Sequence, residues 1–323
     1  MTNKDSFASA DVNFPVKLIS NRKVLDMLSR KELKPIHLQI NPTNRCNLSC
    51  SFCSCKGVDR HAELSLENIE KVISSFDSLQ AVTITGGGEP LMHKNFCEVI
   101  NCFKKQNIEV GLVTNGLLLP RFLISDFDGI TWIRISLSVE SINNNLLNIC
   151  EPYIYNVKTD WAFSFVCGKD VESDFKVIKL FLDKYEDKIT HFRIVNDILN
   201  PDDRVLKLMN WIGPDGNLLN SPKIIWQERN SFFRGHPKCR LAVLKPVITA
   251  DGDIYPCCGT QYALNNFVGN YPPQMKIGTI DTLESIKQLK YFNGSICDKC
   301  YYTSYNTAID KFFNDNIKHE AFI

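Results

Sequence analysis

Short apolar runs alternate with amphipathic segments through roughly the first 200 residues of the chain. The runs are rich in β-branched and aromatic residues, which predicts strands, whereas the amphipathic segments place apolar residues three and four positions apart, which predicts helices. Ser65 stands where an N-cap would begin the first of these helices. The expected strands are 36–40, 81–85, 109–114, 131–139, 161–166 and 191–195, and the expected helices between them lie near 66–79, 96–103 and 175–185.

Strands that alternate with helices at intervals of about 30 residues are typical of βα units and a parallel sheet. An eight-unit barrel usually needs about 250 residues, and the alternation here fades near residue 200. The pattern therefore predicts an α/β fold built as a partial (β/α)6 TIM-like barrel.

Changes in residue composition along the sequence also predict the domain boundaries. One short helix is expected over 21–34, ended by Pro35. From about residue 199 proline and glycine become more frequent and the remaining cysteines gather, and a last helix is expected over about 307–318. The predicted parts are an N-terminal extension at 1–35, a barrel core at 36–230 and a small C-terminal domain at 231–323.

The composition, with 44% hydrophobic and 23% charged residues, is that of an ordinary soluble globular protein. A net charge of +1 creates no overall field that would attract nucleic acid or a membrane, although it does not exclude a local basic groove. Neither a signal peptide nor an apolar stretch approaching the roughly 20 residues of a membrane span is expected. Without an export signal, the 13 cysteines are expected to be reduced thiols or metal ligands in a cytoplasmic protein.

The candidate chemistry begins at Cys46, Cys50 and Cys53, a C-x3-C-x2-C triplet that follows the first expected strand. At this cysteine content such a triplet would arise by chance only about 0.02 times. Three thiolates on one tight loop can hold three corners of a four-iron cluster and leave one iron open to a further ligand. A zinc site or free buried thiols are the alternatives, and zinc would require a fourth protein ligand nearby.

Further elements follow the second, third and fourth expected strands: a Gly86-Gly87-Gly88-Glu89-Pro90 run, the turn Thr114-Asn115-Gly116, and Ser136 within the strand. With the cysteine triplet they resemble the radical S-adenosylmethionine (SAM) superfamily over most of residues 36–200. The resemblance implies a [4Fe-4S] cluster on the triplet, whose open iron binds SAM. It further implies SAM contacts by Phe52, Gly86, Gly87, Gly88, Glu89, Thr114 and Ser136, whereas Ser138 is assigned no role.

The resemblance also implies the reaction. Enzymes of this superfamily reductively cleave SAM, and the resulting 5′-deoxyadenosyl radical abstracts hydrogen from a substrate. A reducing partner such as flavodoxin or ferredoxin would supply the electron. The glycine-rich run would allow the methionyl ammonium of SAM to approach backbone carbonyls, because glycine carries no side chain.

The C-terminal cysteines suggest a second site. Cys297 and Cys300 have the C-x2-C spacing of two ligands on one knuckle, and Cys257 follows a predicted hairpin. With Cys239, this layout resembles the SPASM/twitch extension of radical SAM enzymes, in its shorter twitch form, and implies a second, auxiliary [4Fe-4S] cluster. A structural zinc site is the alternative. Cys257 is preferred over Cys258 as the ligand.

Residues that contact the substrate should come from strand ends. The candidates are Arg193, Asn196 and Asp197 near the sixth strand and Cys167 after the fifth, with Glu228 and Arg229 as weaker ones. Surface salt bridges are the alternative for the charged residues, and buried packing for the cysteine. Cys97 and Cys102 are expected in the core, and no histidine is assigned a role.

Several function classes fit these features. The favoured one is net oxidation (dehydrogenation) of a small molecule with the auxiliary cluster as electron acceptor, because the cysteine layout resembles that of 2-deoxy-scyllo-inosamine dehydrogenases. Modification of a ribosomal peptide is an alternative, although 35 residues are too few for a leader-binding module. Modification of a nucleotide or nucleic acid is another, weakened for polymers by the charge balance. A non-enzymatic iron–sulfur or zinc protein is the remote alternative. No membrane partner is expected.

Overall fold

The computed structural model describes residues 13–137, 142, 145–200, 202–212, 221–227, 233–267 and 269–314. Within these ranges the strands form a ten-stranded sheet in the order β10-β9-β8-β1-β2-β3-β4-β5-β6-β7. The pairs from β8 to β7 along this order are parallel, whereas β9 pairs antiparallel with β8 and β10. The strands are β1 (His37–Ile40), β2 (Ala81–Ile84), β3 (Glu109–Thr114), β4 (Trp132–Leu137), β5 (Asp160–Val166), β6 (Ile189–Val195), β7 (Ile224–Gln227), β8 (Val247–Ile248), β9 (Asp253–Tyr255) and β10 (Gly278–Thr279).

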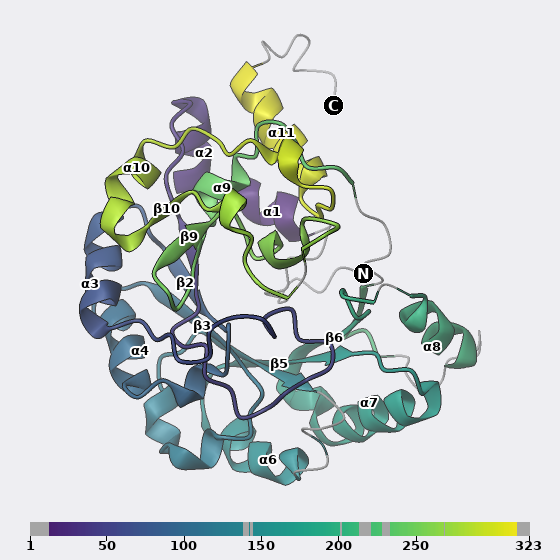
Figure 1. The fold of residues 1–323 in the computed structure, drawn as a ribbon. Helices are drawn as coiled ribbons and strands as arrows, with labels where there is room; N and C mark the ends of the chain where they lie inside the picture. Colours follow the sequence, from purple (N-terminus) through teal and green to yellow (C-terminus); the bar gives the residue numbers. More distant parts are fainter. Residues whose placement is uncertain are drawn as a thin grey trace.

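The helices divide into two groups. Figure 1 shows α3, α4, α6, α7 and α8 on the outside of the curved sheet, while α9, α10 and α11 gather with α1 and α2 at the top of the view. The helices are α1 (Asn13–Ser20), α2 (Arg22–Ser29), α3 (Leu66–Ser75), α4 (Phe96–Lys104), α6 (Leu146–Asn156), α7 (Val171–Tyr185), α8 (Arg204–Ile212), α9 (Leu241–Leu244), α10 (Leu283–Lys287) and α11 (Thr303–Asn314).

Alternation along the strands separates an apolar face from a more polar one. On β4, Ile133 and Ile135 are fully buried in the core between sheet and outer helices, whereas Arg134 and Ser136 between them line a cavity on the other face. This division follows from the two-residue period of a strand. The outer helices cover the apolar face, and the opposite face stays available for a ligand.

The predicted fold class is confirmed, and the six predicted strands correspond to β1–β6 within one or two residues where the structure describes them. The prediction that the alternation ends near residue 200 is wrong, because α8 and the parallel strand β7 continue it. Strand β7 was missed because its four residues, Ile224–Gln227, form only a short apolar run. In addition, α1 was not predicted, α2 is shorter than the expected 21–34 helix, and α11 begins at Thr303.

The segment after residue 233 is attached to the barrel through its first strand. In β8, Val247 and Ile248 pair in parallel with Gln39 and Ile40 of β1, so the sheet continues from the N-terminal strand into the C-terminal segment. The predicted boundaries at 36 and 231 stay predictions, since the shared sheet does not locate a border between domains.

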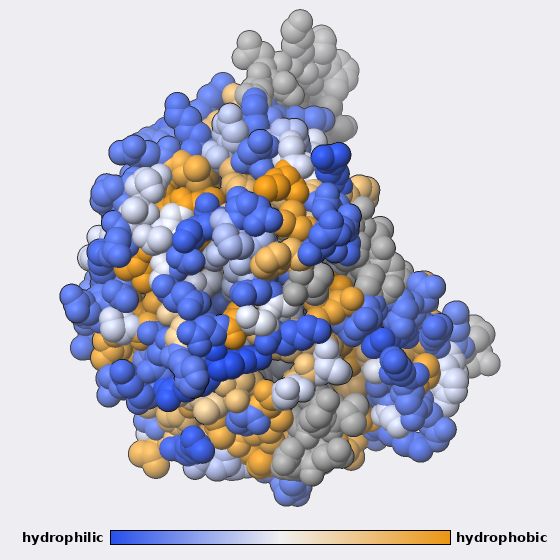
Figure 2. Space-filling view, viewed as in Figure 1, coloured by the Kyte–Doolittle hydropathy of each residue, from blue (hydrophilic) through white to orange (hydrophobic). Residues whose placement is uncertain are grey.

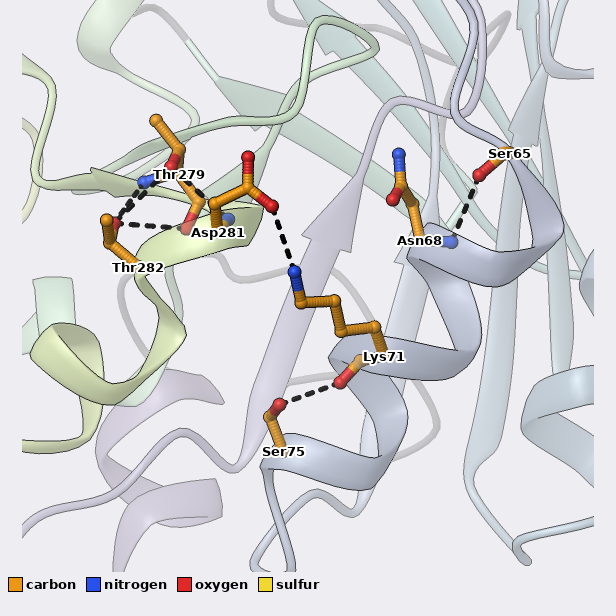
Figure 3. A network of polar contacts seen from close by, with 7 residues as sticks. All are labelled: Ser65, Asn68, Lys71, Ser75, Thr279, Asp281 and Thr282. Carbon is orange, nitrogen blue, oxygen red and sulfur yellow. Dashed lines mark hydrogen bonds and ion pairs between the residues drawn. The ribbon is translucent and has the colours of Figure 1, made fainter.

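Hydrophobic packing also joins the C-terminal segment to α3. Ile280, Leu283 and Ile286 belong to the same buried cluster as Ile69 and Val72 of α3. An ion pair of 2.9 Å between Lys71 Nζ and Asp281 Oδ1 lies beside this contact (Figure 3). Both side chains are exposed, at 47% and 87%, so the pair contributes little and the apolar contact holds the segment.

The surface shown in Figure 2 mixes hydrophilic and hydrophobic side chains, with apolar areas scattered between polar ones. Among the helices of the described residues, none is both long and apolar enough to cross a membrane.

The predicted N-cap of α3 is confirmed, because the Ser65 hydroxyl accepts a hydrogen bond of 3.1 Å from the Asn68 backbone N–H (Figure 3). Ser65→Ala should lower the free energy of unfolding by about 1 kcal/mol, since this N–H then loses its partner. The matched control is Ser75→Ala, where the lost hydroxyl only donates to the Lys71 carbonyl inside the helix. Urea unfolding of both variants measures the difference, and equal effects would contradict the role of Ser65 as the cap.

Candidate active site

The three cysteines of the triplet lie on the loop that leaves β1. Its base is closed by hydrogen bonds from Asn44 N to Ala62 O (3.0 Å) and from Leu64 N to Pro42 O (2.9 Å). Cys46, Cys50 and Cys53 are half-buried. Figure 1 shows this loop, in dark purple, crossing the view in front of the strands.

Backbone hydrogen bonds already tighten this loop around the thiols. Leu48 N donates to Cys46 Sγ at 3.5 Å, and Cys53 N donates to Cys50 O at 3.1 Å. Burial raises the pKa of Cys46, and the nearby Cys53 thiol adds to the shift. A bound metal would favour the thiolate form instead, so this loop offers three soft sulfur ligands of the kind that iron–sulfur clusters use.

The glycine-rich turn after β2 packs directly against this loop. Gly88 N donates to Thr43 O at 3.0 Å, and Glu89 N donates to Arg45 O at 2.8 Å. A Cβ atom on Gly88 would lie 2.1 Å from the Arg45 carbonyl oxygen, and one on Gly87 would lie 1.8 Å from Asn44 Oδ1. Only glycine permits this approach, and the glycines therefore serve the contact between the two loops in addition to any contact with a ligand.

Glu89 connects the turn after β2 with the turn after β3. Its buried carboxylate accepts hydrogen bonds from Thr114 Oγ1 (2.6 Å), Asn115 N (2.7 Å) and Leu91 N (3.1 Å). Burial raises the pKa of Glu89 to about 7, partly offset by these three donors. Asn115 Nδ2 in turn donates to Asn47 Oδ1 of the cysteine loop at 2.8 Å, so three loops from three strand ends are held together.

A cavity of about 2100 Å³ lies on the polar face of the sheet beside these loops. Of the residues expected to contact SAM, Gly86 and Ser136 line it. Thr114 does not line the cavity, and its hydroxyl donates to Glu89. Phe52 does not line the cavity either, and it is half-buried on the cysteine loop. Ser138 lies outside the described residues.

The substrate candidates separate clearly. Arg193 lines the cavity and donates to Ser164 Oγ at 3.0 Å. Asn196 instead accepts from Val205 N (2.8 Å) at the start of α8, and Asp197 accepts from Leu199 N (2.9 Å) within its own loop. Cys167 is buried in the apolar core. The structure thus brings only Arg193 of these four to the cavity, and Glu228 and Arg229 lie outside the described residues.

The C-terminal cysteines meet at a second, small cavity. Cys239, Cys257, Cys297 and Cys300 all line it, whereas Cys258 lines the large cavity and contacts Tyr302 Oη at 3.4 Å. Burial raises the pKa of Cys239 to about 11 and that of Cys297 to about 12, with the nearby Cys300 thiol adding to both. Four cysteines around one cavity supply the kind of sulfur ligands that a metal centre would bind as thiolates.

The chain around this small cavity is built for close contact. Gly259 N donates to Cys257 Sγ at 3.4 Å, and Tyr302 N donates to Cys300 Sγ at 3.3 Å. A Cβ atom on Gly235 would lie 2.1 Å from the Gly294 carbonyl oxygen. In the part of the chain that the structure describes, no three His, Cys, Asp or Glu side chains are already grouped closely enough to hold a single metal ion.

The structure also adds residues that the sequence did not indicate. Gln261 accepts from Ser54 Oγ (2.7 Å) and donates to Cys55 Sγ (2.9 Å), which ties the cysteine loop to the segment after Cys257. Arg60 donates to the carbonyls of Asn44 (3.2 Å) and Gly87 (3.1 Å). No local pattern signals these contacts, because Gln261 and its partners lie more than 200 positions apart.

Comparison with known proteins adds a family and several relatives. Residues 40–159 match the model of the Radical SAM superfamily. Over 137 residues the chain is 31% identical to a GTP 3′,8-cyclase from Actinobacillus pleuropneumoniae serotype 5b (strain L20), covering 38% of this chain and 39% of the relative. It is 28% identical over 118 residues to an S-adenosylmethionine-dependent nucleotide dehydratase from Selenomonas ruminantium, covering 34% and 41%. The matches thus span about two fifths of the length of these curated relatives.

Solved structures share the fold over more of the chain. SuiB from Streptococcus suis, bound to its precursor peptide SuiA, aligns with a TM-score of 0.61 at 16% identity, covering 90% of this chain and 73% of SuiB. Native anSMEcpe with bound AdoMet aligns with a TM-score of 0.55 at 19% identity, covering 83% and 87%. At these identities the likeness concerns the fold alone. The segment that matches the Radical SAM superfamily model, residues 40–159, carries the cysteine loop and the glycine-rich turn.

Proposed function

We propose that this protein is a radical SAM enzyme that abstracts hydrogen from a small molecule and completes a net oxidation. The observation that carries the proposal is the packing of the cysteine loop on the Gly86–Glu89 turn beside the large cavity. Ser54 of the cysteine loop and Gly86 of the turn line this cavity, whose volume would accommodate both SAM and a substrate. The match of residues 40–159 to the superfamily supports the same chemistry.

The cysteine triplet would hold a [4Fe-4S] cluster, and Cys239, Cys257, Cys297 and Cys300 an auxiliary one. When bound, the first supplies the electron that splits SAM into methionine and a 5′-deoxyadenosyl radical, and the second accepts the electron left over by net oxidation. A reducing protein such as flavodoxin or ferredoxin would deliver the first electron.

The chain's own groups orient SAM and protect the radical. Gly86 and Ser136 line the cavity and would contact SAM directly. Phe52 on the cysteine loop, and Gly87 and Gly88 on the turn packed against it, would contact SAM beside the cavity. Glu89 and Thr114 hold two strand-end turns at a fixed separation through their hydrogen bond of 2.6 Å. The sheet and the C-terminal segment would limit access of water to the cavity.

The four C-terminal cysteines are the feature that favours net oxidation of the substrate. Four cysteine ligands would fill the coordination shell, which favours electron transfer over direct binding of substrate. Tyr302 lines both the large and the small cavity, so the two spaces share a wall. An electron acceptor beyond that wall would be close to a substrate in the large cavity.

A second candidate function is modification of a nucleotide. The two relatives named above are a GTP 3′,8-cyclase and a nucleotide dehydratase, and their similarity covers the part of the chain that holds the cysteine loop. A peptide substrate is a further alternative, because SuiB, which shares the fold, was solved with its precursor peptide.

SAM cleavage is the direct test of the proposed reaction. Anaerobically reconstituted protein with dithionite should convert SAM to 5′-deoxyadenosine, and Cys50→Ala should lose this activity at least 100-fold because one of three cluster ligands is removed. Cys97→Ala, a half-buried thiol on α4 outside both sites, is the matched control and should retain activity. Equal product from Cys50→Ala and wild type would refute the assignment.

The assignment of the fourth auxiliary ligand can be tested with two neighbouring cysteines. Cys257→Ala should reduce the iron content by about four atoms per chain, because Cys257 lines the small cavity with three other thiols. Cys258→Ala should retain the iron, since Cys258 lines the large cavity instead. Loss of iron from Cys258→Ala with retention in Cys257→Ala would reverse the assignment, and one zinc in place of iron would make the site structural.

A further inference from the structure

Basic side chains from six separate elements line the large cavity. They are Lys17 of α1, Arg22 and Lys23 of α2, His37 of β1, Arg134 of β4, Arg193 of β6 and Lys245 at the end of α9. Because they come from distant parts of the chain, no charge run in the sequence indicates them.

Sheet register places the two arginines on one face. Arg193 pairs with Ser164 of β5, and Ser164 pairs with Ser136 of β4. Arg134 lies two residues before Ser136, so its side chain projects from the same face one step along the strand. Neighbouring strands are about 4.8 Å apart, which separates β4 from β6 by about 10 Å. Two long guanidinium side chains can therefore reach one small anion between them.

Electrostatic effects indicate that the basic groups influence one another. Burial lowers the pKa of Lys245, and the charge of Arg134 lowers it further, while cysteine thiols oppose the shift. Burial lowers the pKa of His191 to about 3, with Arg134, Arg193 and Lys17 adding to the shift. The pKa of His37 is lowered by burial, then by Lys245 and Lys17. Among described residues, none of the groups that shift these pKa values is a carboxylate.

Carboxylates also line the cavity, at the rim where His37, the first residue of β1, stands. Glu109 and Asp160 are the first residues of β3 and β5, and Asp77 precedes β2, so all three lie at the N-terminal rim of the sheet. In the described part of the chain, the Lys245 ammonium has no hydrogen bond or ion pair to a side chain. Arginine binds oxyanions through its planar fork, so two guanidinium groups and an ammonium on one cavity wall suit an anionic ligand.

We propose that Arg134, Arg193 and Lys245 bind an oxyanion group of the substrate, a phosphate or a carboxylate, and so select a small anionic molecule. The inference rests on the proposed function, because it takes the large cavity as the substrate chamber. Gly86 and Ser136 line the same cavity near the cysteine loop. An anion held by these three residues would leave the rest of the substrate extending toward Gly86 and the cysteine loop, where hydrogen would be abstracted.

Calorimetric titration of the anaerobically reconstituted full chain without SAM tests the inference. Inorganic pyrophosphate and glutarate serve as phosphate and carboxylate probes, at an ionic strength fixed with potassium chloride. Wild type should bind one of them, and the one bound more tightly identifies the anion. Lys245→Gln and Arg193→Gln should each weaken this binding at least tenfold, because a charged hydrogen bond is lost. Lys176→Gln, which removes an exposed charge on the outer helix α7, should leave it unchanged.

The outcomes separate this inference from the proposed function. If wild type binds neither probe, or if all variants bind equally well, Arg134, Arg193 and Lys245 do not form an anion site. Thermal unfolding without probe shows whether each variant folds, and Arg193→Lys, which retains the charge but loses the fork, should bind with intermediate affinity. Formation of 5′-deoxyadenosine with dithionite is measured on the same samples. SAM cleavage without anion binding would support the proposed function and refute the anion site. Anion binding without SAM cleavage would support the anion site and refute the proposed function.

Discussion

The close approach of two backbones, the cysteine loop after β1 and the glycine-rich turn after β2, is the contact on which the candidate site depends. Hydrogen bonds from Gly88 N and Glu89 N to the loop require a separation that any side chain on Gly88 would prevent, because its Cβ would lie 2.1 Å from the Arg45 carbonyl oxygen. Arg60 adds bonds to a carbonyl on each side. With the backbone fixed in this way, the positions of the three thiols are limited before any cluster binds, which reduces the entropy lost on binding.

The parallel sheet explains why these segments meet. Strands β1, β2 and β3 are neighbours and run in the same direction, so the loops after them emerge at one edge of the sheet. The same strand β1 pairs with β8 on its other side, which brings the C-terminal cysteines close to the first site. Gln261 then bonds Ser54 and Cys55. Two cysteine sites far apart in sequence thus share one scaffold.

Much of the architecture could be predicted from the sequence, because strands such as β3 and β5 carry clear β-branched and aromatic runs and Ser65 has the chemistry of an N-cap. The short strand β7 escaped because four residues give too little pattern. The site was less predictable. Asn196 and Asp197 have polar side chains of the kind found in active sites, but both accept hydrogen bonds from nearby backbone N–H groups. Lys245 lines the cavity only because the tertiary fold brings it there. Spacing suggests ligands but cannot show which cavity a side chain faces.

Iron and sulfide content after anaerobic reconstitution tests the central claim most directly, on wild type and on the Cys46→Ala/Cys50→Ala/Cys53→Ala triple variant. Two four-iron clusters predict about eight irons per chain in wild type and about four in the triple variant, with matching sulfide and visible absorption. Absence of iron from reconstituted wild type, or the same iron content in both proteins, would contradict the account.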